Sequence, residues 1–104
     1  MTYVDGFLLP VPKKNLAAYK KMARLGAAVW LKHGALEFRE CVGDDLAVKG
    51  LMGFPDVVKP KAGETIMFSW IVFKSRRQRD TVNKKVMADP LMAKTAPDAV
   101  FAKC

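Results

Sequence analysis

The segment IMFSWIVF, residues 66–73, would be apolar on both faces if it formed a β-strand. Successive side chains of a strand point to opposite sides of its sheet. One side would carry Met67, Ser69, Ile71 and Phe73, and the other Phe68, Trp70 and Val72. A strand with one face in water normally alternates apolar and polar residues, so this strand needs cover on both faces.

The chain before this segment predicts a strand and a helix. Residues 3–10 are rich in aromatic and β-branched side chains and end at Pro10, with Pro12 close behind. They predict a strand that stops at the prolines. Residues 15–33 carry a stripe of apolar or small side chains at helical spacing, which indicates an amphipathic helix. Gly34 favours a left-handed turn at the end of that helix.

A second strand and a long loop are expected next. Residues 35–42 alternate apolar and polar side chains, and Glu40 breaks the apolar face. Residues 46–63 contain several glycines and prolines, which predict a loop with a short extended piece around Val57 and Val58.

The apolar strand is expected over Thr65–Lys74, and a capped helix follows it. Ser75 would be the N-cap, and Gln78, three residues later, would complete a capping box. Pro90 would stop this helix just after Asp89.

The resulting order of elements is strand, helix, strand, loop, strand, helix. It predicts an α+β fold of the ferredoxin-like split βαβ type, written βαββα, whose final strand is short or missing. Residues 99–103 would be a stub of that strand. Residues 1–104 are expected to form one domain. Both helices of such a fold pack on one side of the sheet, so a second copy of the chain would cover the other side.

The composition of the chain bears on its cellular location and on the charge of its binding partners. No apolar run approaches the roughly 18 residues of a membrane span, and Asp5 interrupts the apolar part of the N-terminus, unlike a signal peptide. Cys41 and Cys104 share no metal-like spacing and indicate free thiols. We therefore expect a cytoplasmic protein without membrane contact. The net charge of +8 favours anionic partners.

Three blocks of the chain resemble a known family in their order and spacing. They are YVDGFLLPVPKKNLAAYKKMA, HGALEFRECVGDD and FSWIVFKSRRQRDTVNKKVMADP. The blocks are similar to the YbaA-like family of small uncharacterised bacterial proteins, from Tyr3 to about Pro90. The resemblance implies a dimeric α+β barrel, in which two ferredoxin-like sheets face each other. Family members usually continue into a final strand, whereas this sequence ends at AVFAKC, which would leave the first strand as an exposed edge.

The superfamily implied by this resemblance has many activities. It includes cofactor-independent monooxygenases of polyketide rings, haem-degrading enzymes, isomerases and members of no known activity, so the fold does not choose among them. The first expected function is binding or transformation of a small apolar or aromatic molecule in the barrel cavity, monooxygenase-like by analogy of fold alone. No GxSxG, GxxxxGK or GxGxxG motif is present, and no cofactor is expected.

Five residues are candidates for a catalytic or ligand-contacting role. Trp70, with Phe68, would stack on a planar ligand, and Ser69 or Asp5 would add a polar contact, depending on which face of the sheet looks inward. His33, the single histidine of the chain, would act as a proton shuttle if it faced the cavity. The competing interpretations are that the aromatic residues fill a core or dimer interface, and that His33 suits a helix C-terminus.

Further charged residues have a functional and a structural interpretation. Glu40, Asp44 and Asp45 offer oxygen ligands for a hard cation, but their spacing matches no dedicated loop, so no metal is expected and the two aspartates are interpreted as turn formers. Arg79 is expected to be half-buried beside Val82 and to pair with a carboxylate.

The alternative function is binding of RNA phosphates through the helix faces. Between Gly6 and Leu36 there are six basic residues and no acidic one. Such contacts would be salt-dependent and blind to sequence. The segment IMFSWIVF lacks the basic start and the glycines of the RNA-recognition block that stacks bases on an open sheet.

Overall fold

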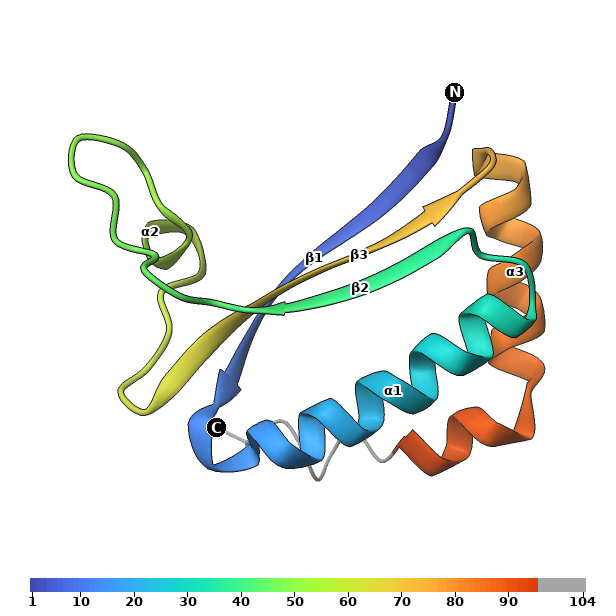
Figure 1. The fold of residues 1–104 in the computed structure, drawn as a ribbon, viewed down its shortest axis with the longest axis horizontal. Coiled ribbons are helices and arrows are strands. Elements are labelled where there is room, and N and C mark those ends of the chain that lie inside the picture. Colours follow the sequence, from blue (N-terminus) through green and yellow to red (C-terminus); the bar gives the residue numbers. More distant parts are fainter. Residues whose placement is uncertain (96–104) are drawn as a thin grey trace.

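The protein is described by a computed structural model in which residues 1–95 are placed (Figure 1). Its elements, in chain order, are β1 Tyr3–Pro12, the 3₁₀ turn η1 Lys13–Asn15, α1 Leu16–Lys32, β2 Glu37–Val42, α2 Phe54–Val58, β3 Glu64–Phe73, α3 Arg76–Ala88 and the 3₁₀ turn η2 Pro90–Thr95. The expected α+β class is confirmed, and the order of elements is compatible with a ferredoxin-like fold. The predicted stub at residues 99–103 lies outside the described residues.

The strands of the described residues form an antiparallel sheet in the order β1-β3-β2. The apolar segment is therefore the central strand, as its composition requires. β1 ends at Pro12, the second of the two prolines expected to stop it, and is two residues longer than the predicted range of 3–10. Proline lacks a backbone N–H and is tolerated on an edge strand, where one side of the backbone needs no ladder partner.

The two long helices begin and end close to the predicted residues. Asn15 and His33 flank α1 as its caps, and Gly34 follows with a φ of +116°. At the start of α3, the Ser75 hydroxyl accepts a hydrogen bond from the Gln78 N–H at 3.1 Å, which confirms half of the capping box. The Gln78 side chain instead accepts from Lys74 N–H at 2.8 Å and donates to the Gly34 carbonyl at 2.6 Å. It therefore joins the start of α3 to the end of α1.

The loop between β2 and β3 contains a helix where an extended piece was expected. The segment around Val57 belongs to α2, so that prediction was wrong. Pro55 lies in the first turn of this helix, where its fixed φ is favourable. The Asp56 carboxylate accepts from the Gly53 N–H at 2.8 Å and holds the turn closed.

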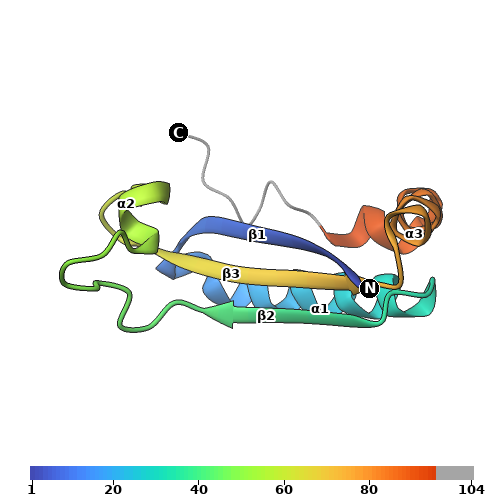
Figure 2. The ribbon, with the colours of Figure 1, turned by 90° about the horizontal axis from the view of Figure 1, so that it is seen from above.

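Helix α1 covers one side of the sheet, behind β3 and β2, while α3 lies beyond the end of the strands (Figure 2). Two buried clusters form on this side. Near α3 the buried members are Val29, Ala35, Ile71, Phe73, Val82 and Val86. Toward the start of α1 they are Val11, Tyr19 and Met67. On β3 the residue between Met67 and Ile71 on this face is Ser69, so a polar position separates the two clusters.

The opposite side of the sheet, which we call the open face, remains partly exposed. Its apolar residues include Val4, 52% exposed, and Phe68, 37% exposed. The half-buried Trp70 lies between them along the sheet. Phe54 of α2 packs on one end of this face, with its ring centroid 5.6 Å from that of Phe68. Only one of the two apolar faces of β3 is thus fully covered by the described residues. No helix among residues 1–95 is long and apolar enough to cross a membrane.

Candidate functional site in the gap between α1 and the sheet

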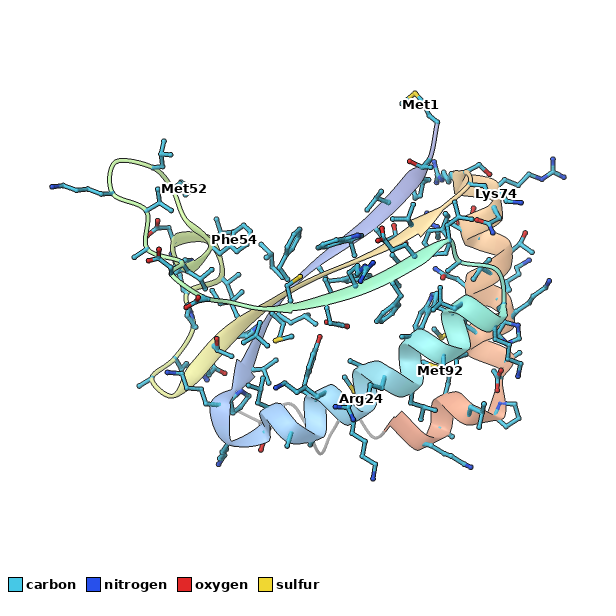
Figure 3. All side chains as sticks on the ribbon, viewed as in Figure 1. Met1, Arg24, Met52, Phe54, Lys74 and Met92 are labelled. Atoms are coloured by element: carbon cyan, nitrogen blue, oxygen red, sulfur yellow. The ribbon has the colours of Figure 1, made fainter. Side chains whose placement is uncertain are left out.

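A cavity of about 520 Å³ lies between α1 and the covered side of the sheet, in the gap that separates the two buried clusters. Its apolar lining comes from both strands and helices: Phe7, Leu9, Met22, Ala23, Gly26, Trp30, Phe38, Ile71 and Met92. Figure 3 shows side chains of α1 and of the sheet pointing toward one another across this gap, with Met92 beside α1. The polar residues that line the cavity are Tyr19, Glu40, Ser69 and Asn83.

Three of these polar side chains form a group across the gap. The Tyr19 hydroxyl on α1 donates to Glu40 Oε2 on β2 at 2.6 Å. The Ser69 hydroxyl on β3 lies beside this pair and, as a donor, lowers the pKa of both Tyr19 and Glu40. Tyr19 is 1% exposed and Ser69 4% exposed. The sheet register pairs Glu40 with Ser69 directly, so the group is built from adjacent strands and the facing helix.

Burial sets the protonation behaviour of this group. It raises the pKa of Glu40, and the hydrogen bonds from Tyr19 and Ser69 lower the Glu40 pKa and offset part of that effect. Burial and the nearby Glu40 carboxylate also hold the pKa of Tyr19 above its ordinary value. A half-buried carboxyl with a raised pKa keeps its proton to higher pH than an exposed one, which is the property required of a general acid.

A second cavity, of about 470 Å³, adjoins the first along α1 and β2. The two share Tyr19, Ala23, Phe38 and Glu40 as lining residues, so the Tyr19–Glu40 hydrogen bond lies at their common wall. The second cavity differs in charge because Lys20 and Arg24 line it. Arg24 lies near the middle of α1 (Figure 3).

Asn83 and Trp30 close the end of the first cavity nearest α3. Trp30 Nε1 donates to the Asn83 side-chain oxygen at 3.1 Å, and this bond connects α1 to α3. The Trp30 ring also packs against Phe38, with centroids 5.9 Å apart. The Trp30 indole is therefore fixed by a hydrogen bond at its N–H and by packing of its ring.

The structure separates the aromatic and polar candidates on β3. Ser69 points to the cavity, whereas Phe68 and Trp70 lie on the open face. Trp70 Nε1 donates to Glu37 Oε2 at 3.3 Å, and its ring packs against Phe68 at a centroid distance of 5.3 Å. Ser69 and Trp70 therefore cannot contact one ligand in the same cavity. The indole that lines the same cavity as Ser69 is that of Trp30.

Asp5 belongs to an ion pair at the end of the sheet. Its carboxylate accepts from Arg79 Nη1 at 2.8 and 3.0 Å, and the guanidinium lies 4.9 Å from the centre of the Tyr3 ring. Arg79 is half-buried, so the expectation that it pairs with a carboxylate is confirmed. The pair joins β1 to α3, and Asp5 is not among the cavity-lining residues of the described chain.

His33 lies at the junction of α1 and α3. Its Nε2 is 2.7 Å from Asp89 Oδ2, and Lys32 Nζ donates to the same oxygen at 3.0 Å. Asp89 Oδ1 accepts from the Leu91 N–H at 2.9 Å. The Leu91 hydrogen bond, followed by those from His33 and Lys32, holds the pKa of Asp89 well below its ordinary value. Neither cavity described above is lined by His33.

The three candidate oxygen ligands do not come together. Glu40 lies in the cavity group, whereas Asp44 and Asp45 are exposed in the loop after β2, where Asp45 adopts a φ of +50° that suits a turn former. Within residues 1–95 no three His, Cys, Asp or Glu side chains cluster closely enough to hold a metal ion.

The sequence contained a signal for the Tyr19–Glu40 hydrogen bond, although the two residues were not predicted to meet. Tyr19 lies on the apolar stripe of α1, and Glu40 is the charged residue that breaks the inward face of β2. A carboxylate on an inward strand position needs a buried hydrogen-bond donor. The facing tyrosine is that donor.

Comparisons with known proteins identify relatives along almost the whole chain. A family model described as "Protein of unknown function (DUF1428)" matches residues 2–103. "Uncharacterized protein YbaA" of Escherichia coli strain K12 is 39% identical over 92 residues, which cover 88% of this chain and 79% of the relative. The protein of the same name from Shigella flexneri shows the same identity and coverage.

Proposed function

The chain belongs to the DUF1428 family and is similar to YbaA, and neither name states a function. We propose from the geometry of the chain that it binds a small apolar or aromatic molecule in the cavity between α1 and the sheet. The observation that carries the proposal is a cavity of about 520 Å³ with an apolar lining and a small buried polar group. Cavities of roughly 300–1,000 Å³ with few, well-placed polar groups are typical of small-molecule sites.

The placement of the polar group supports a ligand role over a purely structural one. A core that only needed to be stable would gain from apolar residues at these positions, since a buried carboxyl is costly to maintain. Here Glu40 interrupts the core between its two clusters, and space remains beside it. The Tyr19–Glu40 pair would offer a bound molecule a hydrogen-bond partner and a proton donor or acceptor.

Binding can be tested with N-phenyl-1-naphthylamine, an uncharged aromatic probe that fluoresces in apolar sites. We expect saturable binding to the wild-type protein, and loss of binding in Ala23→Trp, because Ala23 lines the cavity and the indole would fill it. The matched control is Ala18→Trp, at an exposed position of the same helix. Equal binding by both variants would place the probe elsewhere and would contradict the proposal.

The same proposal includes a homodimer joined through the open face. Its support is the row of exposed or half-exposed apolar residues along β1 and β3, continued onto α2 by Phe54. Such a contiguous apolar patch is typical of an interaction surface, and a second copy would bring an identical apolar face to it.

The mass in solution tests the dimer, measured by light scattering after gel filtration. We expect the wild-type protein to have twice the monomer mass and Phe68→Lys to be a monomer. Leu31→Lys is the control, because Leu31 is an exposed apolar residue of α1, away from the open face. A monomeric wild-type protein would refute this part of the proposal and leave the cavity intact.

A further inference from the structure

The charges beside the cavity are unevenly distributed. Lys20 and Arg24 lie one helical turn apart on α1 and both line the second cavity. Glu40 is the acidic residue among the lining residues of the two cavities. Its carboxyl is occupied by the Tyr19 hydroxyl at 2.6 Å, and burial raises the pKa of Glu40, which reduces its repulsion of an anion.

The two cavities provide different environments at a short separation. The first has a mainly apolar lining and lies between the two buried clusters, and the second lies beside two exposed cations. Because Ala23 and Phe38 line both, a molecule that fills the first cavity can extend a substituent into the second. An anionic substituent there would meet Lys20 and Arg24, whereas a cationic one would be repelled.

Resting on the proposed function, we infer that the ligand is an amphipathic acid. Its apolar or aromatic body fills the cavity beside Trp30 and Phe38, and its carboxylate, sulfonate or phosphate group lies against Lys20 and Arg24. Tyr19 and Glu40 contact the ligand where these two parts join. The net charge of +8 would attract any anion weakly, so the inference requires that these two cations act locally.

Two probes with the same aromatic body test this inference. N-phenyl-1-naphthylamine is uncharged, and 8-anilinonaphthalene-1-sulfonate adds one sulfonate group. We expect the wild-type protein to bind the sulfonate probe about three- to thirtyfold more tightly, as two partly solvated ion pairs would provide. The preference should decrease as salt is raised, because exposed charges are screened.

A pair of double variants separates local contact from net charge. Lys20→Ala with Arg24→Ala should bring the affinities of the two probes to within about twofold of each other. Lys21→Ala with Arg76→Ala also removes one lysine and one arginine, at exposed positions that line neither cavity. This control should retain the preference for the sulfonate.

The outcomes distinguish the inference from the function on which it rests. If the uncharged probe binds in the cavity and the sulfonate has no advantage, the inference is wrong and the binding function stands. If both double variants lose the preference equally, attraction by net charge explains it and the inference is overturned. If neither probe binds, the proposed function fails and the inference fails with it.

Discussion

Replacing Tyr19 by phenylalanine tests whether the cavity group has the energetics that its geometry implies. The substitution removes one oxygen and keeps the ring, so the packing of Tyr19 in its buried cluster is preserved. What is lost is the 2.6 Å hydrogen bond to Glu40 Oε2. Leaving a buried acceptor without its partner costs about 1–3 kcal/mol. Because Glu40 is only half-buried, so that water can replace part of the lost bond, we expect a cost near the lower end, about 1–2 kcal/mol.

The cost should depend on pH in a direction set by Glu40. Its folded-state pKa is raised, so its contribution to stability is fully present below the unfolded-state pKa and is lost as pH rises through the folded-state pKa. The Tyr19 hydrogen bond lowers the Glu40 pKa, so Tyr19→Phe should raise that pKa further and widen the range of pH over which stability falls. The destabilisation should be larger at pH about 8 than at pH about 4, since hydrogen bonds to charged groups are stronger.

Urea unfolding at several pH values, followed by tryptophan fluorescence, measures this free energy. Glu40→Gln provides the control, because it cannot ionise and should remove the fall in stability with rising pH. In that background, Tyr19→Phe should cost less and show no dependence on pH. A Tyr19→Phe protein with wild-type stability at both extremes would refute the account of a buried, hydrogen-bonded carboxyl.

Four further predictions concern other parts of the structure. Gly26→Ala should stabilise the protein by roughly 0.5–1 kcal/mol in urea unfolding, because the added Cβ would meet no atom closer than 3.7 Å in a helix interior; a loss of stability would show that the nearby Trp30 cannot accommodate it. Asp89→Asn should lower the free energy of unfolding at neutral pH and weaken its dependence on pH in acid. A carboxyl with a depressed pKa contributes stability that is lost as pH falls through that pKa. An unchanged dependence on acid pH would contradict this prediction. Sulfonate-probe affinity should rise as pH falls through the Glu40 titration, because the protonated carboxyl no longer repels the sulfonate. Glu40→Gln should abolish that rise, since the Tyr19 pKa is raised away from this range. For the alternative function, RNA bound through the exposed basic residues of α1 and α3 should dissociate steeply between low and moderate salt, and the absence of binding at low salt would exclude it.

Local sequence patterns were sufficient for the elements themselves. The stripe of residues 15–33 predicted α1 to within one residue at each end, and Gly34 predicted the left-handed turn after it. Ser75 and Pro90 predicted the ends of α3. Helix periodicity and capping depend on neighbours within a few residues, so they can be read without the fold. The end predicted at Pro10 was two residues short because the tolerance of a proline depends on the position of its strand in the sheet. Helix α2 did have a local signal, Asp56 three residues after Gly53, but the glycines and prolines of this segment favoured a loop.

The family, the α+β order of elements and the need to cover both faces of β3 were therefore determined by the sequence alone. Which face of β3 looks at the helices, and hence that Ser69 and not Trp70 lies in the cavity, was decided only by the tertiary structure. Side chains of a strand alternate between its two faces, but when both faces are apolar the pattern does not determine which face packs against the helices. Tyr19 and Glu40, 21 residues apart, meet only because α1 folds back across β2. A hydrogen bond between distant residues depends on that packing, which no local pattern contains.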